Sequence, residues 1–146
     1  MSRSGTSQIE IQRPAQDVFS WLDDSEKAIQ WLSGLEEIVP ITEGGNRVGA
    51  QAKHVYVENG RRIEMVEETL AYEPNRHVTL RGVSESFTMT AEYTLTPKGD
   101  ATVLALTSET QFKSRPMRLL SPLLAGFSNR RIMKDLQKLK SLVENA

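Results

Sequence analysis

A long amphipathic segment near the C-terminal end, residues 115–145, constrains the fold more than any other feature of this sequence. At about 100° per residue, its apolar residues form two groups on roughly opposite sides of a helix. The first group is Leu119, Leu120, Leu123, Leu124 and Phe127, and the second is Ile132, Leu136, Leu139 and Val143. One straight helix on one flat core cannot bury both groups. Either the segment bends near Pro122 or Gly126, or its first half covers a ligand cavity, a partner or a membrane.

The segments before this helix show two kinds of periodicity. Ile9 and Ile11 predict a short strand, and Pro14 opens an apolar repeat at helical spacing that ends near Asp24. Ser25 is the expected cap of a second helix, which Gly34 ends. The period then changes to two, which predicts strands at 36–43, 49–58, 62–72, 77–83, 86–96 and 101–112. The expected class is α+β, with one antiparallel sheet that carries helices on one face.

Two local patterns predict how the strands pair and which way they face. Asn59-Gly60 is the dipeptide that a two-residue type I′ turn prefers, so 49–58 and 62–72 should form an antiparallel hairpin. In 86–96, apolar residues alternate with threonines and a glutamate, which predicts one inward face. The residues of that face are Phe87, Met89, Ala91, Tyr93 and Leu95.

Composition is that of an ordinary globular protein, since 38% of the 146 residues are hydrophobic and 25% are charged. A chain without cysteine has no disulfide, no thiolate nucleophile and no Cys-ligated metal. No apolar run has the length of a signal peptide or a membrane-spanning helix, so we expect a soluble, cytoplasmic protein. The length suits one domain, and we expect residues 1–146 to form it.

Charge is unevenly divided along the chain, although its net value is −1. Residues 113–146 contain eight basic and two acidic residues, so a basic tail follows an acidic body. Cations of this tail, such as Arg130 and Arg131, either pair with carboxylates of the same chain or contact an anionic membrane or partner. A net charge near zero without basic-aromatic interleaving argues against nucleic acid. A second copy of the chain is a further candidate partner.

Five segments, in this order, resemble one known family. They are Pro14-Ala15-x-x-Val18-Phe19-x-x-Leu22-x-Asp24, Trp31-Leu32 followed by Val48-Gly49, Glu67-x-Thr69-x-x-Tyr72-Glu73-Pro74-Asn75-Arg76, Glu92-Tyr93-Thr94-Leu95-Thr96-Pro97-x-Gly99 and Leu136-x-x-Leu139-Lys140-x-x-Val143-Glu144. Together they resemble the SRPBCC (START-like, helix-grip) superfamily, and within it the polyketide cyclase/dehydrase and lipid-transport group, over residues 8–144. The resemblance implies a curved seven-stranded antiparallel sheet wrapped around the long C-terminal helix, with two short helices between strands 1 and 2. It also implies an apolar cavity between helix and sheet, where family members bind lipids, sterols, polyketides or aromatic hormones and a minority catalyse reactions.

Motifs for catalysis or metal binding are scarce. His54 and His77 lie on different predicted strands without the spacing of a metal site, and no nucleotide-binding motif occurs, so we expect no metal and no cofactor. His54 shares strand parity with Ala52 and Tyr56, and it either points into the cavity or is a hydrogen-bonded residue of the sheet. Glu64 and Glu68 have the same strand parity as Val66, Leu70 and Tyr72. If this face is the concave one, a carboxyl group could act as a general acid or base in the cavity. Otherwise the two glutamates belong to a solvated acidic face. Arg81 leaves the same two alternatives open.

The site is therefore expected in the cavity. Its candidate ligand-binding residues are Trp31, His54, Tyr56, Glu68, Arg81, Phe87, Met89, Tyr93, Leu120, Leu123, Leu124 and Phe127. The leading hypothesis is a binding or carrier protein for a small hydrophobic ligand of the lipid, polyketide or aromatic class. One alternative is a cyclase or dehydratase that uses His54 or Glu68 with Tyr56 or Tyr93. The other is an interaction module that docks its basic helix on an anionic membrane or partner.

Overall fold

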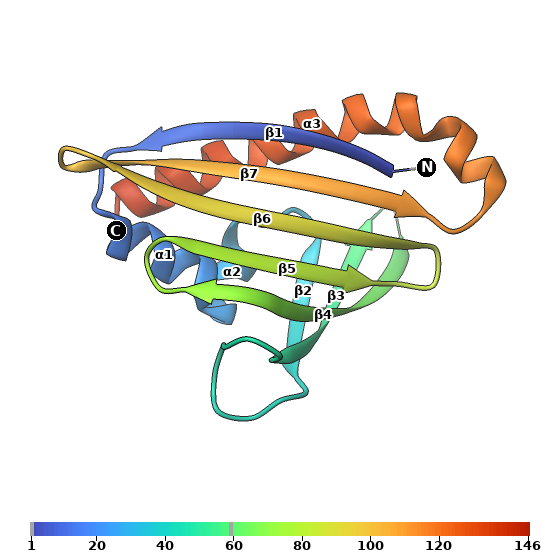
Figure 1. Cartoon of the computed structure of the whole chain (residues 1–146), viewed down its shortest axis with the longest axis horizontal. Helices are drawn as coiled ribbons and strands as arrows, with labels where there is room; N and C mark the ends of the chain where they lie inside the picture. Colours follow the sequence, from blue (N-terminus) through green and yellow to red (C-terminus); the bar gives the residue numbers. More distant parts are fainter. Residues whose placement is uncertain (1, 59) are drawn as a thin grey trace.

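Seven antiparallel strands form one curved sheet, and the long C-terminal helix lies along it (Figure 1). The computed structural model describes the backbone of residues 2–58 and 60–146, and the side chains of residues 5–58, 60–116 and 129–146. The strands are β1 (Ser2–Ile11), β2 (Leu35–Pro40), β3 (Gln51–Glu58), β4 (Arg61–Glu73), β5 (His77–Val83), β6 (Phe87–Lys98) and β7 (Ala101–Phe112). Their order across the sheet is β1-β7-β6-β5-β4-β3-β2. The seven-stranded helix-grip architecture that the resemblance implies is confirmed.

The first strand is longer than the apolar alternation predicts. β1 begins at Ser2 and pairs with β7 along its whole length, from Ser2 opposite Gln111 to Ile11 opposite Thr102. Residues 2–8 are mostly polar and carry no alternating apolar pattern. The backbone ladder to β7 therefore extends the strand, without a buried apolar side chain at every second position.

Two short helices connect β1 to β2, which lie at opposite edges of the sheet. α1 (Ala15–Asp23) follows Pro14 as predicted. α2 (Ser25–Trp31) begins one residue after its cap, which is Asp24 and not Ser25. The Asp24 carboxylate accepts hydrogen bonds from the backbone amides two and three residues further on, at 2.8 and 3.4 Å. The expected cap at Ser25 was wrong, because the carboxylate satisfies two amides of the first turn and complements the positive end of the helix.

The C-terminal helix α3 (Arg115–Glu144) is one continuous element. Its second half carries the predicted packing stripe, in which Leu136 and Leu139 are 0% exposed. The predicted first apolar group lies outside the described side chains, so the cavity candidates Leu120, Leu123, Leu124 and Phe127 stay predictions. Among the described residues, no helix is both long and apolar enough to cross a membrane.

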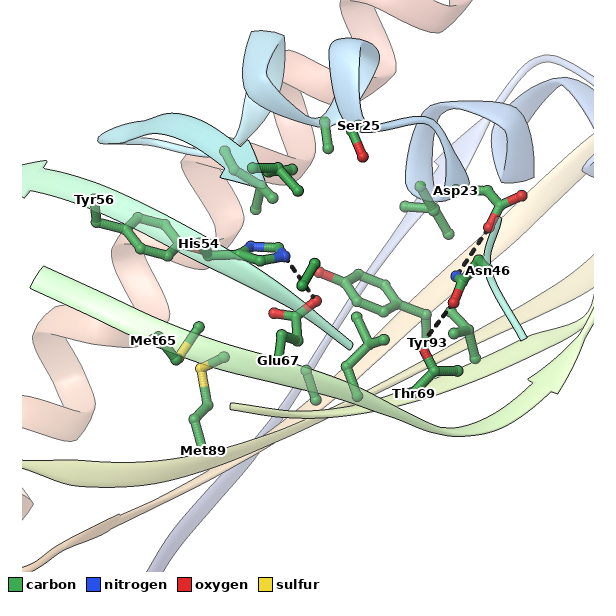
Figure 2. A pocket seen from close by; sticks show the side chains of 18 of the residues that line it. Asp23, Ser25, Asn46, His54, Tyr56, Met65, Glu67, Thr69, Met89 and Tyr93 are labelled. Carbon is green, nitrogen blue, oxygen red and sulfur yellow. Dashed lines mark hydrogen bonds and ion pairs between the residues drawn. The ribbon is translucent and has the colours of Figure 1, made fainter. Parts of the chain in front are cut away.

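A bulge in β4 changes which residues of this strand face the helices. The register with β5 shifts between Thr69 and Ala71, so that one extra residue enters β4. Before the bulge, Met65, Glu67 and Thr69 project from the inner face (Figure 2). After it, Tyr72 returns to that face and contacts the ring of Phe19 at a centroid distance of 5.8 Å. The strand parity that the sequence shows is therefore broken at this point.

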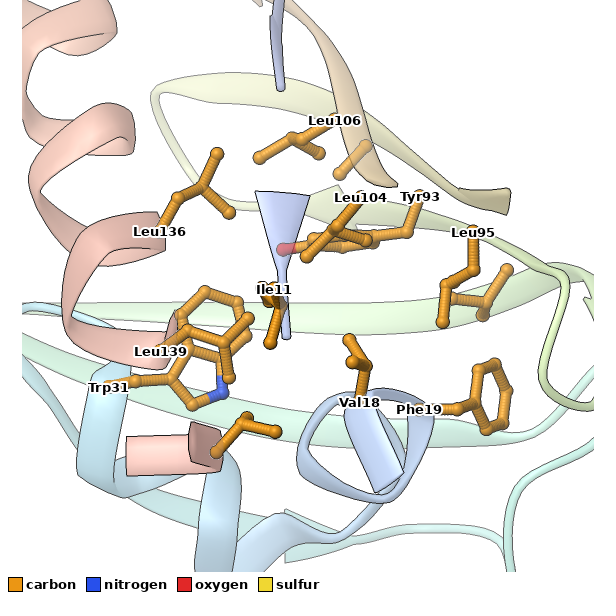
Figure 3. Packing of buried hydrophobic residues seen from close by; sticks show 13 residues of the cluster. Ile11, Val18, Phe19, Trp31, Tyr93, Leu95, Leu104, Leu106, Leu136 and Leu139 are labelled. Atoms are coloured by element: carbon orange, nitrogen blue, oxygen red, sulfur yellow. The ribbon is translucent and has the colours of Figure 1, made fainter. Parts of the chain in front are cut away.

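A core of buried apolar side chains joins the sheet to all three helices (Figure 3). Leu136 and Leu139 of α3 pack with Ile11 of β1 and Leu104 of β7, and all four are 0% exposed. The ring of Trp31 from α2 meets Tyr93 of β6 edge-on, with centroids 6.4 Å apart. Burial of each such side chain stabilises the fold by about 1.5–3 kcal/mol. This core fixes the positions of α2 and α3 relative to the sheet, on which the cavity described next depends.

Candidate functional site

A cavity of about 860 Å³ lies between the inner face of the sheet, the short helices and α3. Its walls are mostly apolar and aromatic. They include Phe19, Trp31, Leu80, Phe87, Met89, Tyr93 and Phe112. A glycine on β5 leaves room for one wall residue, because a Cβ at Gly82 would lie only 2.3 Å from the sulfur of Met65. The size and chemistry are those of cavities that enclose small organic ligands.

Six of the predicted site residues line this cavity. They are Trp31, His54, Tyr56, Phe87, Met89 and Tyr93. The inward face that the alternation predicts for β6 is confirmed, since Phe87, Met89, Ala91 and Tyr93 all border the cavity. His54 points inward rather than away from the cavity, and it is 7% exposed.

Two predicted site residues do not face the cavity. Glu68 and Arg81 pair with each other across β4 and β5, with the guanidinium 3.5 Å from the carboxylate. Both side chains are partly exposed, and neither borders the cavity. The prediction was wrong because it assigned Glu68 to the face of Tyr72, and the bulge separates the two. Glu64 also lies on the outer face, where it pairs with Lys53 at 3.2 Å.

The carboxyl group that lies beside His54 in the cavity belongs to Glu67, which is absent from the predicted site residues. A signal for it was present in the hairpin turn. The hairpin predicted from Asn59-Gly60 implies a strand register, and the observed pairing places Ala52 opposite Glu67 and Tyr56 opposite Ile63. If His54 and Tyr56 face inward, this register requires Ile63, Met65 and Glu67 to do so as well.

Four polar side chains meet inside the cavity, and we refer to them as the polar cluster: His54, Tyr56, Glu67 and Tyr93 (Figure 2). His54 Nε2 lies 3.4 Å from Glu67 Oε1, and the Tyr93 hydroxyl points toward this pair. The rings of His54 and Tyr56 are stacked, with centroids 6.4 Å apart. His54 is the only polar contact of the Glu67 carboxyl within the described part of the chain.

Burial shifts the acid–base properties of the polar cluster toward uncharged forms. It lowers the pKa of His54 to about 4 and raises the pKa of Glu67 to about 7. Burial also raises the pKa of Tyr56 and Tyr93, and the nearby Glu67 carboxyl contributes to both shifts. Between about pH 4 and pH 7, His54 is therefore a neutral imidazole and Glu67 a carboxylic acid.

The contacts of His54 also assign its tautomer. Its Nδ1 is buried and has no hydrogen-bond partner among the described residues. A buried N–H without an acceptor is costly, which favours the ring hydrogen on Nε2, the nitrogen that lies 3.4 Å from Oε1 of Glu67.

Hydrogen bonds at one end of the cavity join α1, β4 and the loop 41–50. Asn46 of this loop donates to Asp23 at 3.0 Å and accepts from the hydroxyl of Thr69 at 2.6 Å. Tyr72 donates to the second oxygen of Asp23, also at 3.0 Å. These contacts, drawn in part in Figure 2, hold the loop against the cavity wall.

Elsewhere in the cavity wall, Arg131 of α3 forms an ion pair with Glu58 of β3 and donates to the carbonyl of Ser33. Asp135, one turn further along α3, accepts from the backbone amide of Ser33 at 3.1 Å and from its hydroxyl. Arg131 is therefore a cation of the basic tail that pairs within the chain, whereas Arg130 is exposed. Docking of this helix on a membrane or partner stays a prediction.

The structure also places the second histidine. His77 lies outside the cavity, where its Nε2 is 2.9 Å from the hydroxyl of Thr79. Among the described residues, no group of three or more histidine, aspartate or glutamate side chains could hold a metal ion.

The sequence matches the model of one protein family, described as polyketide cyclase / dehydrase and lipid transport, over residues 2–144. The chain belongs to this family. Membership confirms the resemblance in the sequence. Among curated proteins, none has a matching sequence.

Several solved structures share the fold of this family member. The aromatase/cyclase ZhuI from Streptomyces sp. R1128 is 16% identical, with a TM-score of 0.81 over 99% of this chain and 94% of that one. The protein TTHA0849 from Thermus thermophilus is 17% identical, with a TM-score of 0.80 over 97% of both chains. Ara h 8.0201 is 11% identical, with a TM-score of 0.75 over the full length of both. Identities this low establish the common fold and no shared activity.

Proposed function

We propose that this protein binds or carries a small hydrophobic ligand in the cavity between its sheet and α3. The observation that supports this function is the cavity itself, which has about 860 Å³ of volume and aromatic walls. A ligand that removes these walls from water gains about 25 cal/mol for each Å² of apolar surface buried. The lipid, polyketide and aromatic classes all fit a site of this size and composition.

Displacement of an uncharged, environment-sensitive dye tests this proposal. The dye should bind with increased fluorescence, and a panel of lipids, sterols and aromatic polyketides should contain members that displace it. Ser108→Phe fills the cavity from β7 and should weaken dye binding at least tenfold. Thr107→Phe is the matched control, because Thr107 does not border the cavity and should tolerate the same ring. Equal affinity of both variants, or no binding by the wild type, would contradict the proposal.

An enzyme of the cyclase or dehydratase type is the second candidate, and the polar cluster is the observation that favours it. Three of the four predicted catalytic candidates, His54, Tyr56 and Tyr93, meet there, and Glu67 takes the place of Glu68. A carboxyl group with a pKa of about 7 suits general acid–base catalysis at neutral pH. The test is exchange of α-hydrogens of a bicyclic aromatic ketone in deuterated water. The enzyme hypothesis requires faster exchange with wild type than with Glu67→Gln, and equal rates would remove it.

A further inference from the structure

The cavity has a charge bias that restricts which hydrophobic ligands it can accept. Among its described lining residues, four carry carboxyl groups: Asp23, Glu43, Glu58 and Glu67. Arg131 is the one guanidinium or ammonium group in the same part of the lining. Its hydrogen atoms are directed at Glu58 and at the carbonyl of Ser33. The described wall therefore offers several acids and a cation that already has partners.

Glu67 is the acid that a ligand inside the cavity would meet. Its side chain is 13% exposed and contacts His54, a neutral group that does not compensate a negative charge. Above its pKa of about 7 Glu67 is itself a carboxylate, and a second carboxylate placed beside it would then share an apolar cavity in which screening is weak. An uncharged oxygen meets the opposite situation, because Glu67 and the Tyr93 hydroxyl can donate to it or accept from it.

We propose that the ligand is an uncharged apolar molecule whose hydroxyl or carbonyl oxygen lies at the polar cluster, and that Glu67 excludes ligands ending in a carboxylate. This inference rests on the proposed binding function and specifies its ligand class. Free fatty acids and aromatic acids are then poor ligands, whereas alcohols, phenols and ketones of the same size are good ones.

A series of four naphthalenes with the same ring position and different end groups tests the inference in the wild-type protein. The probes are methylnaphthalene, naphthalenemethanol, naphthoate and naphthylmethylammonium, each measured by dye displacement at about pH 8, above the pKa of Glu67. Naphthalenemethanol should bind at least as tightly as methylnaphthalene, because the polar cluster replaces the water that its hydroxyl loses. Naphthoate should bind at least tenfold more weakly than naphthalenemethanol.

Two variants separate the role of Glu67 from that of the whole cavity. Glu67→Gln keeps the size of the side chain and removes its charge. In this variant the affinity for naphthoate should rise most of the way to that for naphthalenemethanol. Glu68→Gln is the matched control, since it makes the same change one residue further on, outside the cavity, and should leave the order of affinities unchanged. Circular dichroism and a thermal midpoint establish that each variant is folded.

The outcomes distinguish this inference from the proposed function. Naphthoate binding as tightly as naphthalenemethanol would overturn the inference, as would a tenfold loss for naphthalenemethanol relative to methylnaphthalene. Tightest binding of the ammonium probe, lost in Glu67→Gln, would identify a cation site instead. In each of these cases methylnaphthalene still binds and the proposed function stands. If none of the four probes nor the dye binds, the proposed function itself fails.

Discussion

Removal of either partner of the His54–Glu67 pair should reveal two opposite dependences of stability on pH that nearly cancel in the wild type. Burial holds the pKa of His54 at about 4 instead of 6.5, and that of Glu67 at about 7 instead of 4.5. In the middle of this range the folded pair keeps one proton on Glu67, whereas the unfolded chain keeps it on His54. The number of bound protons is equal, so the pair contributes little slope there.

The sign of each contribution follows from which state binds more protons. For Glu67, the folded state holds a proton between pH 4.5 and 7 that the unfolded state has released. The contribution of Glu67 to the free energy of unfolding therefore decreases as pH rises through this range. For His54, the unfolded state binds a proton between pH 4 and 6.5 that the folded state does not, so stability increases with pH. Each of these two pKa differences corresponds to roughly 3 kcal/mol, as an upper value.

The variants Glu67→Gln and His54→Gln each leave one of these contributions in place. Relative to the wild type, the free energy of unfolding of Glu67→Gln should increase by up to about 3 kcal/mol as pH rises from 4.5 to 7. That of His54→Gln should decrease by a similar amount from pH 4 to 6.5. Differences from the wild type remove the contributions of all other titrating groups. Glu68→Gln, whose carboxylate is partly exposed, should differ from wild type by less than about 1 kcal/mol throughout.

Urea denaturation followed by tryptophan fluorescence, at half-unit intervals of pH, measures these free energies. Trp31 is a suitable reporter because it is 2% exposed and packs beside Tyr93 of the polar cluster. Parallel curves for the two variants would refute the reasoning. So would an NMR titration in which His54 is still cationic at about pH 6, because the pair would then be charge-separated in the folded state.

Two further predictions concern packing. Leu139→Ala should lower the free energy of unfolding by about 2–5 kcal/mol, because Leu139 is 0% exposed in the packing stripe of α3. Leu142→Ala, which changes a partly buried residue of the same helix, should lower it by less. Denaturation curves of both variants measure these losses, and equal losses would contradict the prediction. Gly82→Ala should push the side chain of Met65 into the cavity and weaken binding of the uncharged dye severalfold. The same variant should lower the free energy of unfolding by about 1–3 kcal/mol. Unchanged dye affinity would contradict the prediction, because Met65 would then have found another position.

Strands β2 to β7 were predictable because each rests on local signals. The Asn59-Gly60 turn and the alternation in 86–96 predicted the β3–β4 hairpin and the inward face of β6, and both are confirmed. The full length of β1 was not predictable in this way. Its polar first half is extended because β7 offers a backbone ladder, and that partner is brought alongside by the order of the strands across the sheet.

Whether Glu67 or Glu68 faces the cavity depends on two features of β4, its hairpin register with β3 and its bulge opposite β5. The hairpin register would have selected Glu67, since it pairs this residue with Ala52 on the face of His54. The apparent parity of Glu68 with Tyr72 pointed the other way, because one inserted residue reverses the alternation and leaves no mark in the local pattern. A local period identifies a strand, but it does not reveal where a bulge interrupts it.

The sequence by itself determined the element order, the family, the packing stripe of α3 and six of the residues that line the cavity. These depend on periodicity and turn chemistry, which act over a few residues. Only the tertiary structure decided that Glu67 enters the cavity beside His54, that Arg131 pairs with Glu58, and that the cavity holds about 860 Å³. Burial and pKa shifts arise where strands distant in the sequence enclose a side chain together, so no local pattern encodes them.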